Sequence, residues 1–246
     1  TGVTFPVQRL FFSRYEQAEQ YGPGFSVKLF DDQLAGLGLG LQGVVNTRNV
    51  ALPEFIRDYR QLLIFAHTGG ELWRNIELEG EDPLDKTSIR LADDFMRRIG
   101  EVDYEIAYPT DLFTIDLIAF GRQLGWHNDS KLSIGINAQF GTWFAYRFVI
   151  AANTNFFETA FVEAHPCETC VRKPCIDACP GAAVTEGVFD LSRCSIERLR
   201  PDSDCAENCG ARLACPVGTE YRYEPEQVRY HYGRSLVFLR AYQEDS

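Results

Sequence analysis

All eight cysteines of this 246-residue chain fall between positions 167 and 215, and their spacing limits what the chain can hold. They form two groups of four, each ending in a Cys-Pro pair, namely Cys167, Cys170, Cys175 and Cys179, followed by Cys194, Cys205, Cys209 and Cys215. Thiolates are soft ligands suited to iron, and four of them hold one cubane. The spacing therefore predicts two [4Fe–4S] clusters.

The Cys-Pro pairs predict which thiols share a cluster. In bacterial two-cluster ferredoxins, the cysteine before proline binds the cluster that is built mainly from the other run. One predicted set is therefore Cys167, Cys170, Cys175 and Cys215, and the other is Cys179, Cys194, Cys205 and Cys209. Four residues separate Cys170 from Cys175 where the compact ferredoxin pattern has two, so we expect residues 172–174 to widen this loop.

Other cysteine chemistries fit this spacing less well. Zinc sites usually consist of two Cys-x2-Cys pairs, and only Cys167 and Cys170 have that form. A disulfide framework is typical of short secreted chains, whereas this chain is long and has an ordinary apolar fraction of 45%. Zinc and disulfides therefore stay as alternatives to the clusters.

The chain is acidic, with 35 Asp and Glu against 24 Lys and Arg and a formal net charge of -11. An acidic surface repels phosphate backbones, so we expect no nucleic-acid partner. The sequence has no run of about 18 apolar residues, so we expect no membrane partner either. Clustered free thiols without an export signal favour a cytoplasmic location.

The patterns before the cysteines predict strands interspersed with helices. Strands are expected over residues 62–66, 132–136 and 142–150, the last two around a turn at 137–141. One helix is expected to run from Pro83 to Gly100, with Asp82 and Asp85 as capping residues, and a second to cover residues 111–125. This order predicts an α/β or α+β domain that carries a ferredoxin-like insert.

A glycine-rich stretch contains a literal G-x-G-x-x-G from Gly38 to Gly43. A dinucleotide site would require an apolar strand before the glycines and a helix after them. Neither is clear in this sequence, so the stretch is interpreted as a turn or bulge.

Several segments resemble known corrinoid proteins. The stretch from Leu124-Gly-Trp126 to Phe140-Gly-Thr-Trp143-Phe144, followed about twenty residues later by the cysteines, resembles epoxyqueuosine reductase and the related reductive dehalogenases. Residues 82–85, 134–147 and 223–230 are similar to the CblC cobalamin-processing protein. The chain therefore resembles a CblC-like domain, of nitroreductase-like α/β fold, with an inserted dicluster ferredoxin-like module.

The resemblance implies three parts and a cofactor. Residues 1–160 would form a CblC-like cofactor or substrate domain, residues 161–218 the dicluster module, and residues 219–246 a C-terminal helix that returns to the first domain. The implied cofactor is cobalamin, with FMN as the alternative because related folds bind flavin. Epoxyqueuosine reductase also carries an acidic proton donor shortly before its Leu-Gly-Trp segment, and Asp111 is the candidate here.

Four residues are expected to contact this cofactor: Trp126, His127, Tyr146 and Arg147. Arg147 interrupts an apolar strand, and a buried cation needs a carboxylate, a phosphate or an amide as its partner. We therefore expect a large planar ligand between the loop at residues 126–131 and the strand at 142–150. His67, which follows a buried strand, is expected to be a hydrogen-bonded structural residue.

These features indicate an oxidoreductase in which two clusters pass single electrons to a corrinoid, or to another cofactor or small-molecule substrate. The cofactor would carry out the bond chemistry. An electron donor such as ferredoxin or flavodoxin would be the protein partner. The alternatives are a non-catalytic ferredoxin-type electron carrier and a corrinoid-binding or trafficking protein without turnover.

Overall fold

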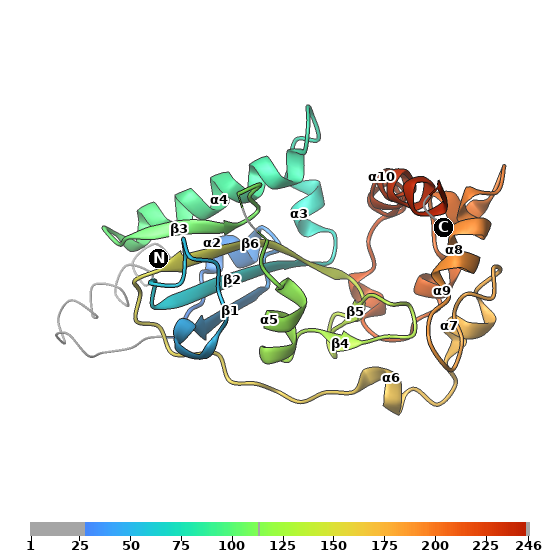
Figure 1. The fold of residues 1–246 in the computed structure, drawn as a ribbon, viewed down its shortest axis with the longest axis horizontal. Coiled ribbons are helices and arrows are strands. Elements are labelled where there is room, and N and C mark those ends of the chain that lie inside the picture. Colours follow the sequence, from blue (N-terminus) through green and yellow to red (C-terminus); the bar gives the residue numbers. More distant parts are fainter. Residues whose placement is uncertain (1–27, 113, 245–246) are drawn as a thin grey trace, which may run out of the picture.

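The computed structural model describes residues 28–112 and 114–244, and its centre is a four-stranded sheet with helices on both faces (Figure 1). The strands are β1 (Leu41–Asn46), β2 (Gln61–Thr68), β3 (Tyr104–Tyr108) and β6 (Phe144–Ala152). Their order is β1-β2-β6-β3, and all three neighbouring pairs are antiparallel. The expectation of a mixed α/β class is confirmed, with an antiparallel sheet.

Helices and short turns connect these strands. Before β6 they are α2 (Asp32–Gly36), η2 (Thr47–Asn49), α3 (Glu71–Arg74), α4 (Pro83–Ile99) and α5 (Leu117–Gln123), together with the small ribbon of β4 (Asn128–Asp129) and β5 (Gly135–Ile136). After β6 they are α6 (Pro166–Thr169), α7 (Pro174–Asp177), α8 (Leu191–Leu199), η3 (Asp204–Ala206), α9 (Gly210–Leu213), η4 (Thr219–Tyr221) and α10 (Pro225–Glu244).

The two faces of the sheet carry separate cores. Leu63 and Phe65 of β2 pack on one face together with Phe95 of α4. Their neighbours Leu62 and Ile64 point to the other face, where α5 covers them. Successive strand residues point to opposite faces, so a strand that is buried on both faces reads as a continuous apolar run. This is why β2 is apolar along residues 62–66.

The long helix α4 confirms the prediction for residues 83–99. It begins with Pro83 at its first position and ends at Gly100, whose φ of 106° favours glycine. Asp82 holds the position before the helix, but its side chain makes no capping hydrogen bond. Asp82 is therefore at the expected N-cap position, but its carboxylate pairs with Arg234 of α10 and does not cap the helix by a hydrogen bond.

The region between α4 and β6 differs from the expected pattern. The helix expected over residues 111–125 is limited to α5, which starts after Asp116, whose side chain accepts a hydrogen bond from the backbone of Ala119. Only residues 135–136 of the expected 132–136 strand are extended, and they pair with β4. The expected turn at 137–141 is present and is closed by two backbone hydrogen bonds between Asn137 and Gly141, but β5 pairs with β4 and not with β6.

The glycine-rich stretch forms a connection and not a nucleotide loop. Gly38 has a φ of 90° and leads from α2 into β1, so a strand follows the glycines where a dinucleotide site needs a helix. Gly43 lies within β1, and a Cβ atom there would come within 2.8 Å of the Trp126 ring. The stretch therefore serves the chain turn and the packing of Trp126.

The cysteine-bearing segment lies beyond one end of the sheet. An extended connection leaves β6 and leads to α6, as Figure 1 shows. Thr159 fixes part of this connection to β1 by two hydrogen bonds with the backbone of Val44. The chain then passes through the short helices α6 to α9 and ends in α10, which packs against α8. No helix in the described ranges is long and apolar enough to cross a membrane.

Candidate functional site: two thiol groups and the end of the sheet

The first thiol group consists of Cys167, Cys170, Cys175 and Cys215. Burial raises the pKa of the Cys175 thiol, and the neighbouring thiols of Cys167, Cys215 and Cys170 raise it further. Burial likewise raises the pKa of Cys215, against a hydrogen bond from the backbone of Val217 that lowers it. These mutual effects show that the four sulfur atoms lie near one another, although Cys215 is 40 residues from Cys175 in the sequence.

The second thiol group consists of Cys179, Cys194, Cys205 and Cys209. Burial raises the pKa of Cys194 to about 11, and the thiols of Cys209, Cys179 and Cys205 add to this effect. The pKa of Cys205 is raised by burial and then by Cys209. The structure therefore groups the eight thiols in the way that the Cys-Pro rule predicts, with Cys179 and Cys215 exchanged between the two runs.

The donor set fits iron–sulfur clusters in its chemistry. All eight cysteines are free thiols, so the disulfide alternative finds no pair in this structure. Within the described ranges, no three His, Cys, Asp or Glu side chains converge on a point that would hold one metal ion. A single zinc requires such convergence, whereas a cubane offers each thiolate a separate iron atom. Raised thiol pKa values also mean that metal binding must release protons.

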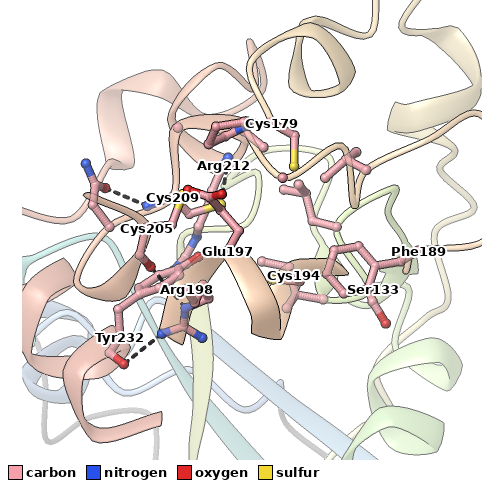
Figure 2. A pocket seen from close by; sticks show the side chains of 18 of the residues that line it. Ser133, Cys179, Phe189, Cys194, Glu197, Arg198, Cys205, Cys209, Arg212 and Tyr232 are labelled. Carbon is pink, nitrogen blue, oxygen red and sulfur yellow. Dashed lines mark hydrogen bonds between the residues drawn. The ribbon is translucent and has the colours of Figure 1, made fainter. Parts of the chain in front are cut away.

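A cavity of about 390 Å³ opens beside the second thiol group. Figure 2 shows its lining, which includes all four thiols of that group together with Ser133, Phe189, Glu197, Arg198, Arg212 and Tyr232. Most of the lining is apolar, and ligand sites typically have such walls with a few polar groups. The residues 132–134 at the tip of the β4–β5 ribbon line it as well, so the cavity lies between this ribbon and the thiols.

At the end of β2, three buried side chains form a hydrogen-bonded chain. Nε of Arg147 donates to Nδ1 of His67 at 2.7 Å, and Nε2 of His67 lies 2.8 Å from the Tyr223 hydroxyl. Because a guanidinium only donates, a neutral His67 carries its proton on Nε2 and donates it to the hydroxyl oxygen of Tyr223. Burial, and then the charge of Arg147, hold the pKa of His67 well below its usual value. His67 is therefore the hydrogen-bonded residue that we expected.

A β-bulge explains how Arg147 reaches His67. The register of β2 and β6 shifts between Phe65 and Ala66, so that Arg147 is the extra residue between Phe148 and Tyr146. A bulge can turn a side chain to the other face of a strand. Arg147 is consequently directed to the α4 face with Phe148, while Tyr146 packs on the α5 face.

Arg147 is a buried cation that has no ion-pair partner among the described side chains. Its side chain is 7% exposed, and no carboxylate in the described part of the chain lies within ion-pairing distance. Burial raises the pKa of Asp85 in α4, while the charge of Arg147 lowers it. His231 of α10 has its pKa lowered to about 4 by burial, Arg147 and Arg212. The terminal nitrogens of Arg147 therefore remain available to an anionic or amide group.

Arg212 connects this group with the second thiol group. Its backbone N–H donates to the Cys209 sulfur at 3.4 Å, and its guanidinium donates to Thr142. The same guanidinium lies 4.2 Å from the ring centre of Trp143 and 5.1 Å from that of Tyr223. A short path of contacts thus runs from a thiol through Arg212 to Tyr223 and His67.

The other predicted cofactor residues lie on the opposite face of the sheet. Tyr146 is half-buried against Gly121 of α5, its buried hydroxyl has no hydrogen-bond partner among the described residues, and burial raises its pKa. His127 packs against the same Gly121, and burial lowers its pKa. Trp126 belongs to the same core. In the described ranges, no hydrogen bond or ring contact joins Arg147 to Tyr146 or His127. The four predicted residues therefore divide between two sites, one with Trp126, His127 and Tyr146 and the other with Arg147.

Asp111 lies outside both sites. It is exposed, in a bend between β3 and α5, and its charge raises the pKa of Asp85. Arg147 acts on Asp85 by its charge, whereas the sequence indicated only a role in capping α4 for Asp85. Arg212 was missed as a site residue because it belongs to no motif, and Tyr223 was singled out only as part of the segment 223–230 that resembles CblC. Their positions depend on how the cysteine segment folds back onto β2.

Comparisons with known proteins show a similarity of fold alone. The chain matches no family model and no curated protein. Among solved structures, it resembles an epoxyqueuosine reductase in complex with an epoxyqueuosine-modified tRNA-Tyr stem loop, with a TM-score of 0.50 and 12% identity over 80% of this chain and 66% of that one. A selenomethionine-labelled epoxyqueuosine reductase gives 0.51 and 11% over 80% and 68%.

A reductive dehalogenase, NpRdhA in complex with 3-bromo-4-hydroxybenzoic acid, is also found, with a TM-score of 0.48 and 12% identity over 85% of this chain and 34% of that one. The chain spans about two thirds of the length of the epoxyqueuosine reductases. The class that the fold defines is therefore a mixed α/β protein built like epoxyqueuosine reductase.

Proposed function

We propose that the chain is an iron–sulfur oxidoreductase in which two [4Fe–4S] clusters pass single electrons to a cofactor or substrate. One observation carries the proposal: eight free thiols form two groups of four with the cross-over of Cys179 and Cys215. When bound, such clusters supply one-electron transfer at a potential that the protein tunes. A low-potential one-electron carrier such as ferredoxin or flavodoxin would supply the electrons.

The chain's own residues would prepare each thiol group for its cluster. Cys209 receives the backbone N–H of Arg212, and Cys215 receives that of Val217. Such hydrogen bonds favour the thiolate over the thiol and offset the burial that raises the thiol pKa values. Residues 161–218 would form the dicluster module, between a cofactor domain of residues 1–160 and a returning helix of residues 219–246.

We place the electron acceptor at Arg147, with a corrinoid as the first candidate and FMN as the second. Only Nε of this guanidinium donates a hydrogen bond among the described residues, which leaves its terminal nitrogens for a ligand, and both cofactors carry a phosphate. Arg212, Tyr223 and His67 link this position to the second thiol group. The alternative site, at Tyr146 and His127, lies on the other face of β6, so one planar ligand cannot contact both.

The experiment that tests the proposal is anaerobic reconstitution followed by iron and acid-labile sulfide analysis and EPR of the reduced protein. We expect close to eight iron and eight sulfide per chain, because four of each form one cubane. One stoichiometric zinc, or no iron, would overturn the proposal. Absorbance titration of the reconstituted protein with cob(II)alamin and with FMN then tests the acceptor.

A non-catalytic electron carrier is the second candidate. It is favoured if reconstituted protein holds both clusters and shows no spectral change with either cofactor. His67, Tyr223 and Arg147 would then be a structural tie between the sheet and the cysteine segment. A corrinoid-trafficking protein would instead bind cobalamin without passing electrons to it.

A further inference from the structure

The loop between Cys170 and Cys175 presents an apolar side chain and a cation beside the first thiol group. Val171 is 91% exposed, and Arg172 is exposed as well. The loop leads into α7, which lies at the end of the molecule away from the sheet, as Figure 1 shows. Because Val171 follows Cys170 directly, a protein that touched Val171 would lie one residue, or roughly 4 Å of chain, from a cluster ligand.

A second exposed turn is joined to this loop by an ion pair. Nζ of Lys173 lies 3.4 Å from the carboxylate of Glu186, and Lys131 of the β4–β5 ribbon donates to the carbonyl oxygen of Glu186. Within the turn, the Thr185 hydroxyl donates to the carbonyl oxygen of Val188 at 3.1 Å. These contacts fix the turn, and the side chain of Val188 at its end is 90% exposed.

The two loops together form one surface, which we call the docking face and which consists of Val171, Arg172, Lys173 and Val188. Two almost fully exposed valines thus lie on loops that an ion pair between Lys173 and Glu186 connects. Apolar side chains among cations are typical of a protein–protein contact, in which the apolar residues are central and the charged residues form the rim.

The first thiol group keeps cations that no carboxylate neutralises. Among the described side chains, Arg172 has no ion-pair partner, and Arg222 donates only to backbone carbonyl oxygens, one of which is that of Cys215. The nearest acidic residues in the sequence, Glu168 of α6 and Asp177 of α7, lie outside the loop on either side. Arg172 therefore keeps its full charge for a partner.

The exposed arginines beside the second thiol group are instead paired with carboxylates. Three such pairs have nitrogen–oxygen distances of 3.3, 2.8 and 3.3 Å, namely Arg193 with Asp190, Arg200 with Glu197 and Arg229 with Glu207. A cation that already has a carboxylate gains less from a second one. The first thiol group is therefore the one that a negatively charged protein can approach more easily.

We propose that the docking face receives an acidic one-electron carrier, which reduces the cluster of the first thiol group; this inference rests on the proposed function. A chain with a net charge of -11 repels an acidic protein over most of its surface, so local cations decide where such a protein docks. One electron leaves the carrier and enters the oxidised cluster. No bond forms or breaks, and no proton is transferred.

The test follows the reduction of the reconstituted protein by flavodoxin hydroquinone, an acidic carrier that becomes a semiquinone when it loses one electron. We expect Arg172→Glu to lower the second-order rate constant about tenfold at low ionic strength, because electrostatic steering contributes roughly 10–1,000-fold. The loss should shrink above about 0.15 M salt, where the Debye length falls below about 8 Å.

Arg240→Glu is the matched control, because it makes the same change in net charge at an exposed position of α10, which packs against α8. Its rate constant should stay close to that of wild-type protein. Val171→Ser tests the apolar part of the docking face. It should lower the rate constant about fourfold at both low and high salt, because salt does not screen a lost apolar contact.

Reduced methyl viologen, a small cationic one-electron donor, separates docking from an effect on the cluster itself. Arg172→Glu should keep the wild-type iron content and lose no rate with this reductant. Slowing with both reductants, equal slowing by Arg240→Glu, or failure of flavodoxin to reduce iron-replete wild-type protein would overturn the docking inference while leaving the clusters in place. Absence of iron from wild-type protein would instead overturn the proposed function.

Discussion

The Tyr223 hydroxyl lies 2.8 Å from Nε2 of His67, and this contact ties the segment after the cysteines to the end of β2. The two rings are 5.4 Å apart between their centres, and Tyr223 also packs edge-on against Trp143. The cysteine segment is therefore fastened to the sheet by a buried contact. A buried pair of this kind fixes the distance between the thiols and Arg147.

The first prediction concerns the pH dependence of folding through His231. Its folded pKa of about 4 lies below the usual 6.5, because burial and the charges of Arg147, Arg212 and Arg234 disfavour the imidazolium. The unfolded chain therefore takes up the proton first as the pH falls. The contribution of neutral His231 to the free energy of unfolding is fully present above pH 6.5 and decreases as the pH drops toward 4. We expect wild-type protein to lose about 2 kcal/mol between pH 7 and 5 through this residue.

Replacement of His231 by Gln should remove this part of the pH dependence. The measurement is the free energy of unfolding from denaturant titration at both pH values. His165→Gln is the control, because His165 is half-exposed and pairs with Glu163 at the surface. Parallel pH curves for wild-type protein and His231→Gln would show that the buried imidazole does not contribute.

Local chemistry made part of this structure predictable. The limits of α4 followed from Pro83 and Gly100, which act within one turn of chain. The grouping of the thiols followed from ligand spacing, because each cluster draws on fixed offsets along the sequence. The sequence rule and the structure agree on this grouping, while the binding of iron stays a prediction.

Register and long-range packing were not predictable in the same way. Arg147 and Tyr146 are adjacent in the sequence, and simple alternation gives no sign of the bulge that places Arg147 beside His67. A bulge depends on the pairing of two strands that are 80 residues apart in the sequence, and no local residue type indicates that pairing. Likewise, the turn at 137–141 formed as expected, but the strand before it pairs with β4 and not with β6, and the choice of strand partner is not set by local residue types.

The second prediction tests the cross-over of the two thiol groups. Cys179→Ser should damage the site that contains Cys194, Cys205 and Cys209, and Cys215→Ser should damage the site that contains Cys175. Each variant should lose about half of the iron, because a serine oxygen replaces one of four thiolates. EPR of the two reduced variants should show complementary remaining signals. Loss of the same signal in both would contradict the grouping.

The third prediction concerns the close contact between Gly121 and Tyr146. A Cβ atom at position 121 would overlap the Tyr146 hydroxyl and approach His127, so Gly121→Ala should destabilise the protein by about 1–3 kcal/mol. Gly233→Ala in α10 is the control, because no atom lies within 4 Å of its added Cβ, and it should stabilise by about 0.5–1 kcal/mol. Tyr146→Phe should restore part of the loss in a double-mutant cycle.

The fourth prediction concerns nucleic acid. The solved reductase with a bound tRNA stem loop shares the fold, yet here many exposed cations are already paired with carboxylates. Examples are Arg74 with Glu71 and Glu224, Arg122 with Asp129, Arg229 with Glu207 and Arg234 with Asp82. A cation that must leave a carboxylate gains less from a phosphate. We expect no submicromolar binding of tRNA at about 0.15 M salt. A gel-shift assay that shows such binding would restore epoxyqueuosine-tRNA as a candidate substrate.

The fifth prediction separates the two candidate cofactor sites. If the acceptor binds at Arg147, Arg147→Ala should weaken binding of cobalamin or FMN at least tenfold, which corresponds to about 1.4 kcal/mol for one charge-assisted contact. Tyr146→Phe should leave the affinity unchanged, because Tyr146 faces α5 on the other side of β6. Iron content should equal that of wild-type protein in both variants, since neither side chain touches a thiol. Absorbance titration measures affinity and cluster content in one sample. The opposite result, in which Tyr146→Phe weakens cofactor binding and Arg147→Ala leaves it unchanged, would move the cofactor to the site of His127. Arg147 would then have a structural role beside His67.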